Sequence, residues 1–144
     1  MRVVRFAAFT VLVPDGWEDV TDSLDIEDPP ITLARDDGVG ALQFSIATYS
    51  RGEWPDPSPD DLLGMVEEFG RSRGLGSPGD VLTRSGRLRM AAGGFLAAGD
   101  FVRAWYVSDG LSFALATYVC EAGREAEELA ECEQIIGSLA FIAR

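Results

Sequence analysis

The stretch GDFVRAWYVSDGLSFALATYVCE, residues 99–121, decides the fold. Its two apolar runs flank Asp109-Gly110, a dipeptide that readily takes the positive φ angles of a tight hairpin turn. A two-residue turn at this dipeptide pairs Ser108 with Leu111 and so sets the register of the two strands. We therefore expect an antiparallel hairpin at the centre of a sheet.

This register divides the side chains of the hairpin between two faces. One face carries Val102, Ala104 and Tyr106 opposite Thr117, Leu115 and Phe113, and the other carries Phe101, Arg103, Trp105 and Val107 opposite Tyr118, Ala116, Ala114 and Ser112. Both faces are largely apolar, which is typical of a hairpin covered on both sides by helices, loops or a partner. We assign Tyr106, Phe113 and Leu115 to the interior of the protein.

The second face has aromatic side chains beside alanines, with one charged residue among them. Two interpretations of it stay open: a helix covers the face and Arg103 pairs with a carboxylate, or the face is a groove or a dimer surface. Trp54 lies in the proline-rich loop at 50–59, where a rigid aromatic either covers the end of a core or anchors an interface. The candidate protein-binding residues are Trp54, Phe101, Arg103, Trp105 and Tyr118.

The rest of the chain supplies elements that pack around the hairpin. Alternation of apolar residues and turn signals predict further strands at 5–13, 31–35, 41–49, 81–90 and 94–98. One helix begins after Ser58, with Pro59 in its first turn, and a second covers 124–138. We predict a single α+β domain over residues 1–144, with a central antiparallel sheet of about six to seven strands and two main helices, in the order β-β-β-α-β-β-β-β-α.

The net charge of −12 narrows the possible partners. It arises from 24 Asp and Glu residues against 12 basic residues, all of them arginine, a bias typical of a GC-rich bacterial genome. Such a surface repels nucleic acids and anionic lipids, so we expect neither nucleic acid nor a membrane as a partner, and it attracts basic proteins. The simpler alternative is that the acidity only keeps the protein soluble.

The start of the chain and its hydropathy favour a cytoplasmic location. No segment approaches the roughly 20 consecutive apolar residues that span a bilayer. The first apolar run is interrupted by Arg5 and runs into a turn at Pro14, which indicates a strand rather than a signal peptide.

The residues needed for common catalytic chemistry are missing. The chain has no histidine, so it cannot form a Ser-His-Asp or Cys-His nucleophile pair by itself. Two cysteines are too few for a disulfide framework, and we expect Cys120 and Cys132 to be buried, reduced thiols. We therefore expect a protein that is not an enzyme, and keep an enzyme using carboxylates alone as a third hypothesis.

Two patterns that could indicate a bound ligand are better explained otherwise. GLGSPG at 74–79 matches G-x-G-x-x-G, but it follows a helix instead of joining a strand to one, so we predict no nucleotide cofactor. The acids Asp22, Asp25, Glu27 and Asp28 lack the ligand spacing of an EF-hand, so we predict no metal site.

Short motifs at both ends of the chain carry a family resemblance. They consist of Phe9, Val11, Pro14, Gly16 and Trp17 near the start, and Ile136, Ser138, Leu139 and Phe141 near the end. With the order strands, helix, strands, helix, the chain resembles the PsbP-like fold family, which includes photosystem PsbP proteins, the Ran-binding Mog protein and bacterial DcrB-type domains. The resemblance implies an antiparallel sheet flanked by helices and a binding protein rather than an enzyme.

Two functions follow as hypotheses. The first is a non-catalytic protein-binding domain, an immunity-type protein that neutralises a toxin or effector through its acidic surface. The alternative is a chaperone or adaptor of a secreted effector, a homodimer whose apolar surface near Trp105 and Tyr118 shelters a hydrophobic segment. The chain lacks the lipoprotein signal of envelope relatives, which again favours the cytoplasm.

Overall fold

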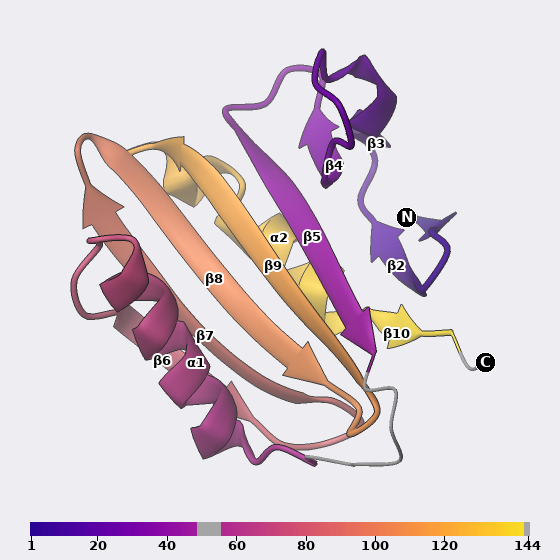
Figure 1. Cartoon of the computed structure of the whole chain (residues 1–144). Helices are drawn as coiled ribbons and strands as arrows, with labels where there is room; N and C mark the ends of the chain where they lie inside the picture. Colours follow the sequence, from indigo (N-terminus) through magenta and orange to yellow (C-terminus); the bar gives the residue numbers. More distant parts are fainter. Residues whose placement is uncertain (49–55, 143–144) are drawn as a thin grey trace.

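The computed structural model describes residues 1–48 and 56–142 of the chain. Its strands in this part of the chain are β1 (Arg2–Arg5), β2 (Phe9–Val13), β3 (Trp17–Asp19), β4 (Ile31–Arg35), β5 (Gly40–Thr48), β6 (Gly79–Arg84), β7 (Arg89–Ala97), β8 (Asp100–Ser108), β9 (Ser112–Glu121) and β10 (Ala140–Phe141). Its α-helices are α1 (Pro59–Ser72) and α2 (Leu129–Gly137). Seven strands form one antiparallel sheet in the order β3-β4-β5-β9-β8-β7-β6, and β1-β2-β10 form a smaller sheet (Figure 1). The predicted α+β class and the size of the central sheet are confirmed.

The boundaries of several predicted elements differ from the observed ones. The predicted strand at 5–13 is a hairpin of β1 and β2, because the chain turns between Arg5 and Phe9. The predicted helix at 124–138 begins with a 3-10 turn, and its α-helical part starts only at Leu129. Pairing of Phe141 with Phe9 then adds the end of the chain to the small sheet as β10.

The β8–β9 hairpin lies at the centre of the large sheet, as predicted, but with a different turn. Ser108 pairs with Phe113, so four residues lie between the last paired positions instead of two. The side chain of Asp109 accepts hydrogen bonds from the backbone N–H groups of Leu111 (2.9 Å) and Ser112 (2.7 Å), which stabilises the wider turn. The observed register differs from the predicted one by two residues, and an even shift keeps every side chain on its predicted face.

The two faces of the large sheet are covered by different elements. Helix α1 lies on one face over β7 and β8, while α2 and the small sheet lie on the other (Figure 1). The α1 side has a small core that consists of Leu62, Val66, Phe69, Ala91, Phe95, Ala104 and Tyr106. The α2 side has the larger core, which includes Phe9, Trp17, Leu42, Phe44, Trp105, Tyr118, Ile135 and Ile136.

Helix α1 starts as its sequence predicts. The Ser58 side chain accepts a hydrogen bond from the Asp61 backbone N–H (3.1 Å), and the Asp61 side chain accepts one from the Ser58 N–H (2.9 Å). This reciprocal capping box satisfies two N–H groups that the first helical turn leaves without partners. No helix in the described part of the chain is long and apolar enough to cross a membrane.

Close packing of α1 on β7 predicts the effect of a single methyl group. A Cβ added at Gly93 would lie 2.6 Å from Pro78 Cβ and 2.9 Å from Val66 Cγ1, so Gly93→Ala forces the helix away from the strand. We expect Gly93→Ala to lower the free energy of unfolding by about 1–3 kcal/mol, measured by urea denaturation. Gly86→Ala is the matched control, because nothing lies within 4 Å of its added Cβ; an equal loss in both variants would contradict this packing.

Candidate functional site

The predicted binding residues on the hairpin lie mostly beneath α2. The side chains of Trp105 and Tyr118 are 0% exposed and Arg103 is 5% exposed. Arg103 Nε lies 2.8 Å from Glu133 Oε1, and Trp105 Nε1 donates to Glu133 Oε2 at 3.0 Å. Of the two interpretations, the structure therefore shows a face covered by a helix with Arg103 paired to a carboxylate, and it corrects the alternative of an open groove there.

Tyr118 takes part in a second link between the sheet and α2. Its hydroxyl donates to Glu128 Oε1 at 2.8 Å, and the same oxygen accepts the backbone N–H groups of Val39 (3.2 Å) and Gly40 (3.0 Å). Burial, with hydrogen bonds to Cys120 and Glu128, raises the pKa of Tyr118, so the phenol stays protonated. Tyr118 thus holds the start of α2 against β5 and β9.

The other two candidate residues have different positions. Phe101 is half-buried at the edge of the larger core; it pairs with Leu96 on β7, and its ring lies beside Gly94. Trp54 lies outside the described residues, so its role in binding stays a prediction.

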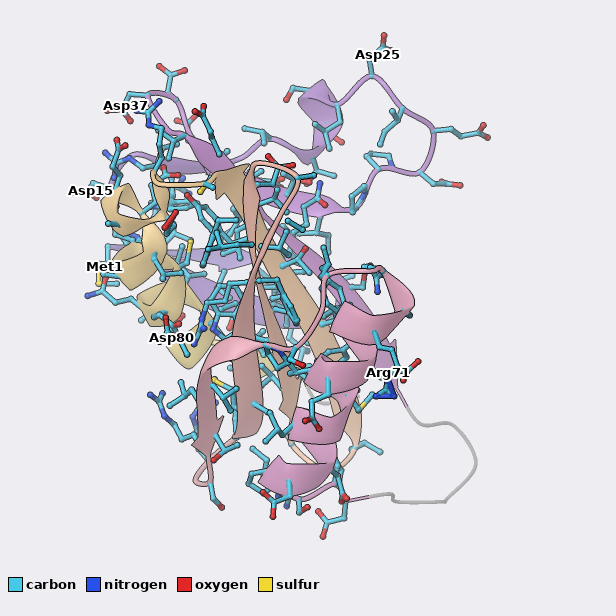
Figure 2. The ribbon with its side chains drawn as sticks, turned by 90° about the vertical axis from the view of Figure 1, so that its left-hand side faces the viewer. Met1, Asp15, Asp25, Asp37, Arg71 and Asp80 are labelled. Carbon is cyan, nitrogen blue, oxygen red and sulfur yellow. The ribbon has the colours of Figure 1, made fainter. Side chains whose placement is uncertain are left out.

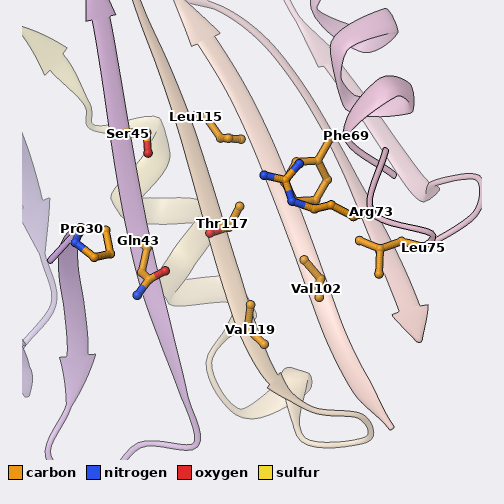
Figure 3. Close-up of a pocket in the computed structure, with 10 residues that line it drawn as sticks. All are labelled: Pro30, Gln43, Ser45, Phe69, Arg73, Leu75, Val102, Leu115, Thr117 and Val119. Carbon is orange, nitrogen blue, oxygen red and sulfur yellow. The ribbon is translucent and has the colours of Figure 1, made fainter. Parts of the chain in front are cut away.

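An open groove lies on the opposite face of the sheet, beside the C-terminal end of α1 (Figure 3). Its volume is about 390 Å³, and its lining residues are Pro30, Gln43, Ser45, Phe69, Arg73, Leu75, Val102, Leu115, Thr117 and Val119. On this face Tyr106 is buried as predicted, but Leu115 is only half-buried and lines the groove. The face that we assigned to the interior from the sequence is thus partly open.

The groove has a mainly apolar floor and one cationic wall. The floor on β8 and β9 consists of Val102, Leu115 and Val119, with the single polar residue Thr117 between the last two, and Val119 is 42% exposed. At the end of α1, the guanidinium carbon of Arg73 lies 4.0 Å from the centroid of the Phe69 ring. Such stacking combines cation–π attraction with a fixed orientation of the guanidinium plane.

Exposed carboxylates form a second surface, at one end of the molecule. Residues 15–37 carry the exposed acids Asp15, Glu18, Asp19, Asp22, Asp25, Glu27, Asp28, Asp36 and Asp37. Asp25 and Asp37 lie at the upper end in Figure 2, whereas Arg71 lies lower. We call residues 20–30, between β3 and β4, the acidic loop; it presents Ile26, 60% exposed, among its carboxylates.

The two cysteines are free and buried, as predicted. Burial raises the pKa of both thiols, and nearby carboxylates including Glu128 raise it further, so neither is an activated nucleophile. Within residues 1–48 and 56–142, no group of three or more His, Cys, Asp or Glu side chains is placed to hold a metal ion.

Comparison with solved structures defines the class of fold as PsbP-like. A solution structure of cyanobacterial PsbP (CyanoP) from Synechocystis sp. PCC 6803 matches with a TM-score of 0.63 at 9% identity, over 93% of this chain and 86% of that one. A crystal structure from Bacteroides thetaiotaomicron VPI-5482 matches with a TM-score of 0.60 at 14% identity, over 94% of this chain and 46% of that one. This chain therefore spans less than half of the Bacteroides protein. No family model and no curated protein matches the sequence. These identities establish a shared fold, and the resemblance predicted from the sequence is confirmed at that level.

Loss of the Glu133 carboxylate should destabilise the protein more than loss of an exposed partner. Glu133→Ala leaves Arg103 Nε and the indole N–H of Trp105 buried without their acceptor, and the Arg103 charge without its carboxylate, although Nη1 still donates to the Asp80 carbonyl. We expect the free energy of unfolding to fall by about 2 kcal/mol or more, measured by urea denaturation. Glu131→Ala, which removes one of the two carboxylate partners of the more exposed Arg35, should cost less than about 1 kcal/mol; the reverse order would contradict the buried link.

Buried thiols with raised pKa values should resist alkylation and disulfide exchange. At about pH 8 we expect Cys120 and Cys132 to react with Ellman's reagent at least about tenfold more slowly in the native protein than in urea. Rapid labelling of either thiol in the native protein would contradict the observed burial.

Proposed function

We propose that this protein is a non-catalytic protein-binding domain of the immunity type, which neutralises a toxin or effector through its acidic end. The observation that carries this proposal is the concentration of exposed carboxylates around the acidic loop. From Phe6 to Ala34 the chain has no basic residue, and among the nine exposed acids of residues 15–37 only Asp15, near the N-terminal amine, and Asp37, beside Arg35, pair with a cation of the described residues. A surface of this kind speeds encounter with a basic protein and orients it.

The uneven distribution of charge supports binding over solubility alone. Exposed Arg84 ends β6 and exposed Arg87 lies in the turn that follows, at the other end of the long strands from the β4–β5 turn. Solubility requires net charge, but it does not require nine exposed carboxylates to lie within residues 15–37. Exposed Ile26 adds an apolar side chain that is surrounded by carboxylates. An apolar centre with a polar rim is the usual composition of a protein interface.

The proposal includes the class of partner and the place of action. The partner is a basic protein, such as a toxin or nuclease, that meets this domain in the cytoplasm of a bacterium. Nucleic acid and anionic membranes are disfavoured partners because the same carboxylates repel them. The domain acts by covering the partner's surface and contributes no catalytic group of its own.

An effector chaperone would need an apolar surface other than the one predicted from the sequence. Its apolar surface was expected near Trp105 and Tyr118, and α2 covers both residues. A homodimer formed through that face would require α2 to move, breaking the contacts of Glu128 and Glu133. The immunity-type proposal needs no such rearrangement.

A triple substitution in the acidic loop tests the proposal directly. We expect Asp22→Asn/Asp25→Asn/Asp28→Asn to slow association with the natural partner by about tenfold near 50 mM salt, because steering depends on exposed charge. The partner is first captured from the source cells with the wild-type protein and identified by mass spectrometry. Association is then measured with the purified pair by stopped flow or biolayer interferometry.

The control variant removes the same amount of charge elsewhere. Asp60→Asn/Glu67→Gln/Asp80→Asn changes three other exposed acids and should keep association within about twofold of the wild type. At about 500 mM salt the difference between the two variants should disappear. An association rate that does not depend on salt, or that falls equally in both variants, would rule out the acidic end as the binding surface.

A further inference from the structure

Arg73 is one of the five described arginines, out of ten, that form no ion pair, and it lies on the wall of the groove. Five described arginines, Arg35, Arg71, Arg89, Arg103 and Arg124, form ion pairs with carboxylates. None of the described carboxylates pairs with Arg73, whose observed partner is the Phe69 ring. The positive charge on the wall of the groove is therefore available to a ligand.

Stacking on Phe69 gives this cation a defined direction. The side chain of Arg73 crosses the ring at the end of α1, on the wall of the groove (Figure 3). A guanidinium that stacks through its plane keeps its N–H groups in that plane, where they can donate to an anion. Paired N–H donors of this kind match the two oxygens of a carboxylate.

The floor of the groove suits an apolar body. Val102, Leu115 and Val119 lie between the Arg73 wall and the polar side chain of Gln43, and Thr117 lies on β9 between Leu115 and Val119 (Figure 3). The volume of about 390 Å³ lies within the range of about 300–1,000 Å³ that is usual for small-molecule sites. Apolar walls with a few convergent polar groups are the usual composition of such sites.

We infer that this groove binds a small amphipathic anion, a molecule with an apolar body and a carboxylate head. The body lies on the floor of β8 and β9, and the carboxylate accepts hydrogen bonds from Arg73. The basic protein that we propose as the partner of the acidic end does not suit this groove, because the positive charge of Arg73 would repel it. The inference goes beyond the proposed function, since it assigns a different surface and a different class of ligand.

Octanoate and 1-octanol provide a matched pair of probes, because they share a chain of eight carbons and differ in charge. Binding is followed by NMR from the methyl resonances of Val102, Leu115 and Val119. We expect saturable shifts of these methyls with octanoate, and weaker binding of 1-octanol. Arg73→Gln should weaken octanoate binding by about fivefold or more and leave 1-octanol unchanged.

Two further variants separate the charge of Arg73 from the shape of the groove. Arg71→Gln removes an arginine from the same helix that pairs with Glu68, and octanoate binding should not change. Leu115→Gln alters the floor, and it should weaken both probes. Circular dichroism and urea denaturation confirm that each variant is folded.

Several results would overturn the inference. They are the absence of saturable shifts with octanoate, shifts confined to residues outside the groove, and equal octanoate affinity for wild type and Arg73→Gln. A capped, uncharged apolar peptide that fills the groove equally well in wild type and Arg73→Gln would instead assign it to a protein segment. The acidic end is not involved in these measurements, so a failure to bind octanoate leaves the proposed function unaffected. A failure of the acidic-loop experiment likewise leaves the inference about the groove unaffected.

Discussion

The width of the seven-stranded sheet is the constraint on which the rest of the structure depends. Six spacings of about 4.8 Å make the sheet about 29 Å wide, whereas a helix with its side chains is about 10–12 Å across. One helix can therefore cover only two or three strands. On one face, α2 and the small sheet together bury the larger core. On the other, α1 contacts mainly β7 and β8, and the surface of β9 and β5 stays open as the groove.

The centre of this sheet could be predicted because the assignment of its side chains to the two faces stays correct when the register is wrong by two residues. The hairpin dipeptide Asp109-Gly110 located β8 and β9, but it could not reveal that the Asp109 side chain supports a wider turn. A two-residue difference preserves the alternation of faces, so Trp105 and Tyr106 were still assigned to opposite sides. The start of α1 was equally predictable, since its capping box depends on residues three positions apart.

Which face is open could not be read from the hairpin alone, because both of its faces are apolar. The informative signal lay in β5, where buried Leu42 and Phe44 alternate with Gln43 and Ser45. Polar residues on one side of a strand indicate solvent on that side. Arg73 gave no such signal, because an arginine at a helix C-terminus is expected on electrostatic grounds and its place beside the groove depends on tertiary packing.

The two surfaces meet at one point of the chain. The acidic loop ends at Pro30, and Pro30 lines the groove, opposite the wall that Arg73 forms. Ile31 then pairs with Phe44 in the sheet, which fixes the end of the loop to a rigid strand. A partner on the loop and a ligand in the groove could influence each other through their charges or through a change in the position of Pro30, and such coupling would act equally in both directions. With β4 paired to β5, the sheet resists that displacement, and the geometry favours two sites that bind independently.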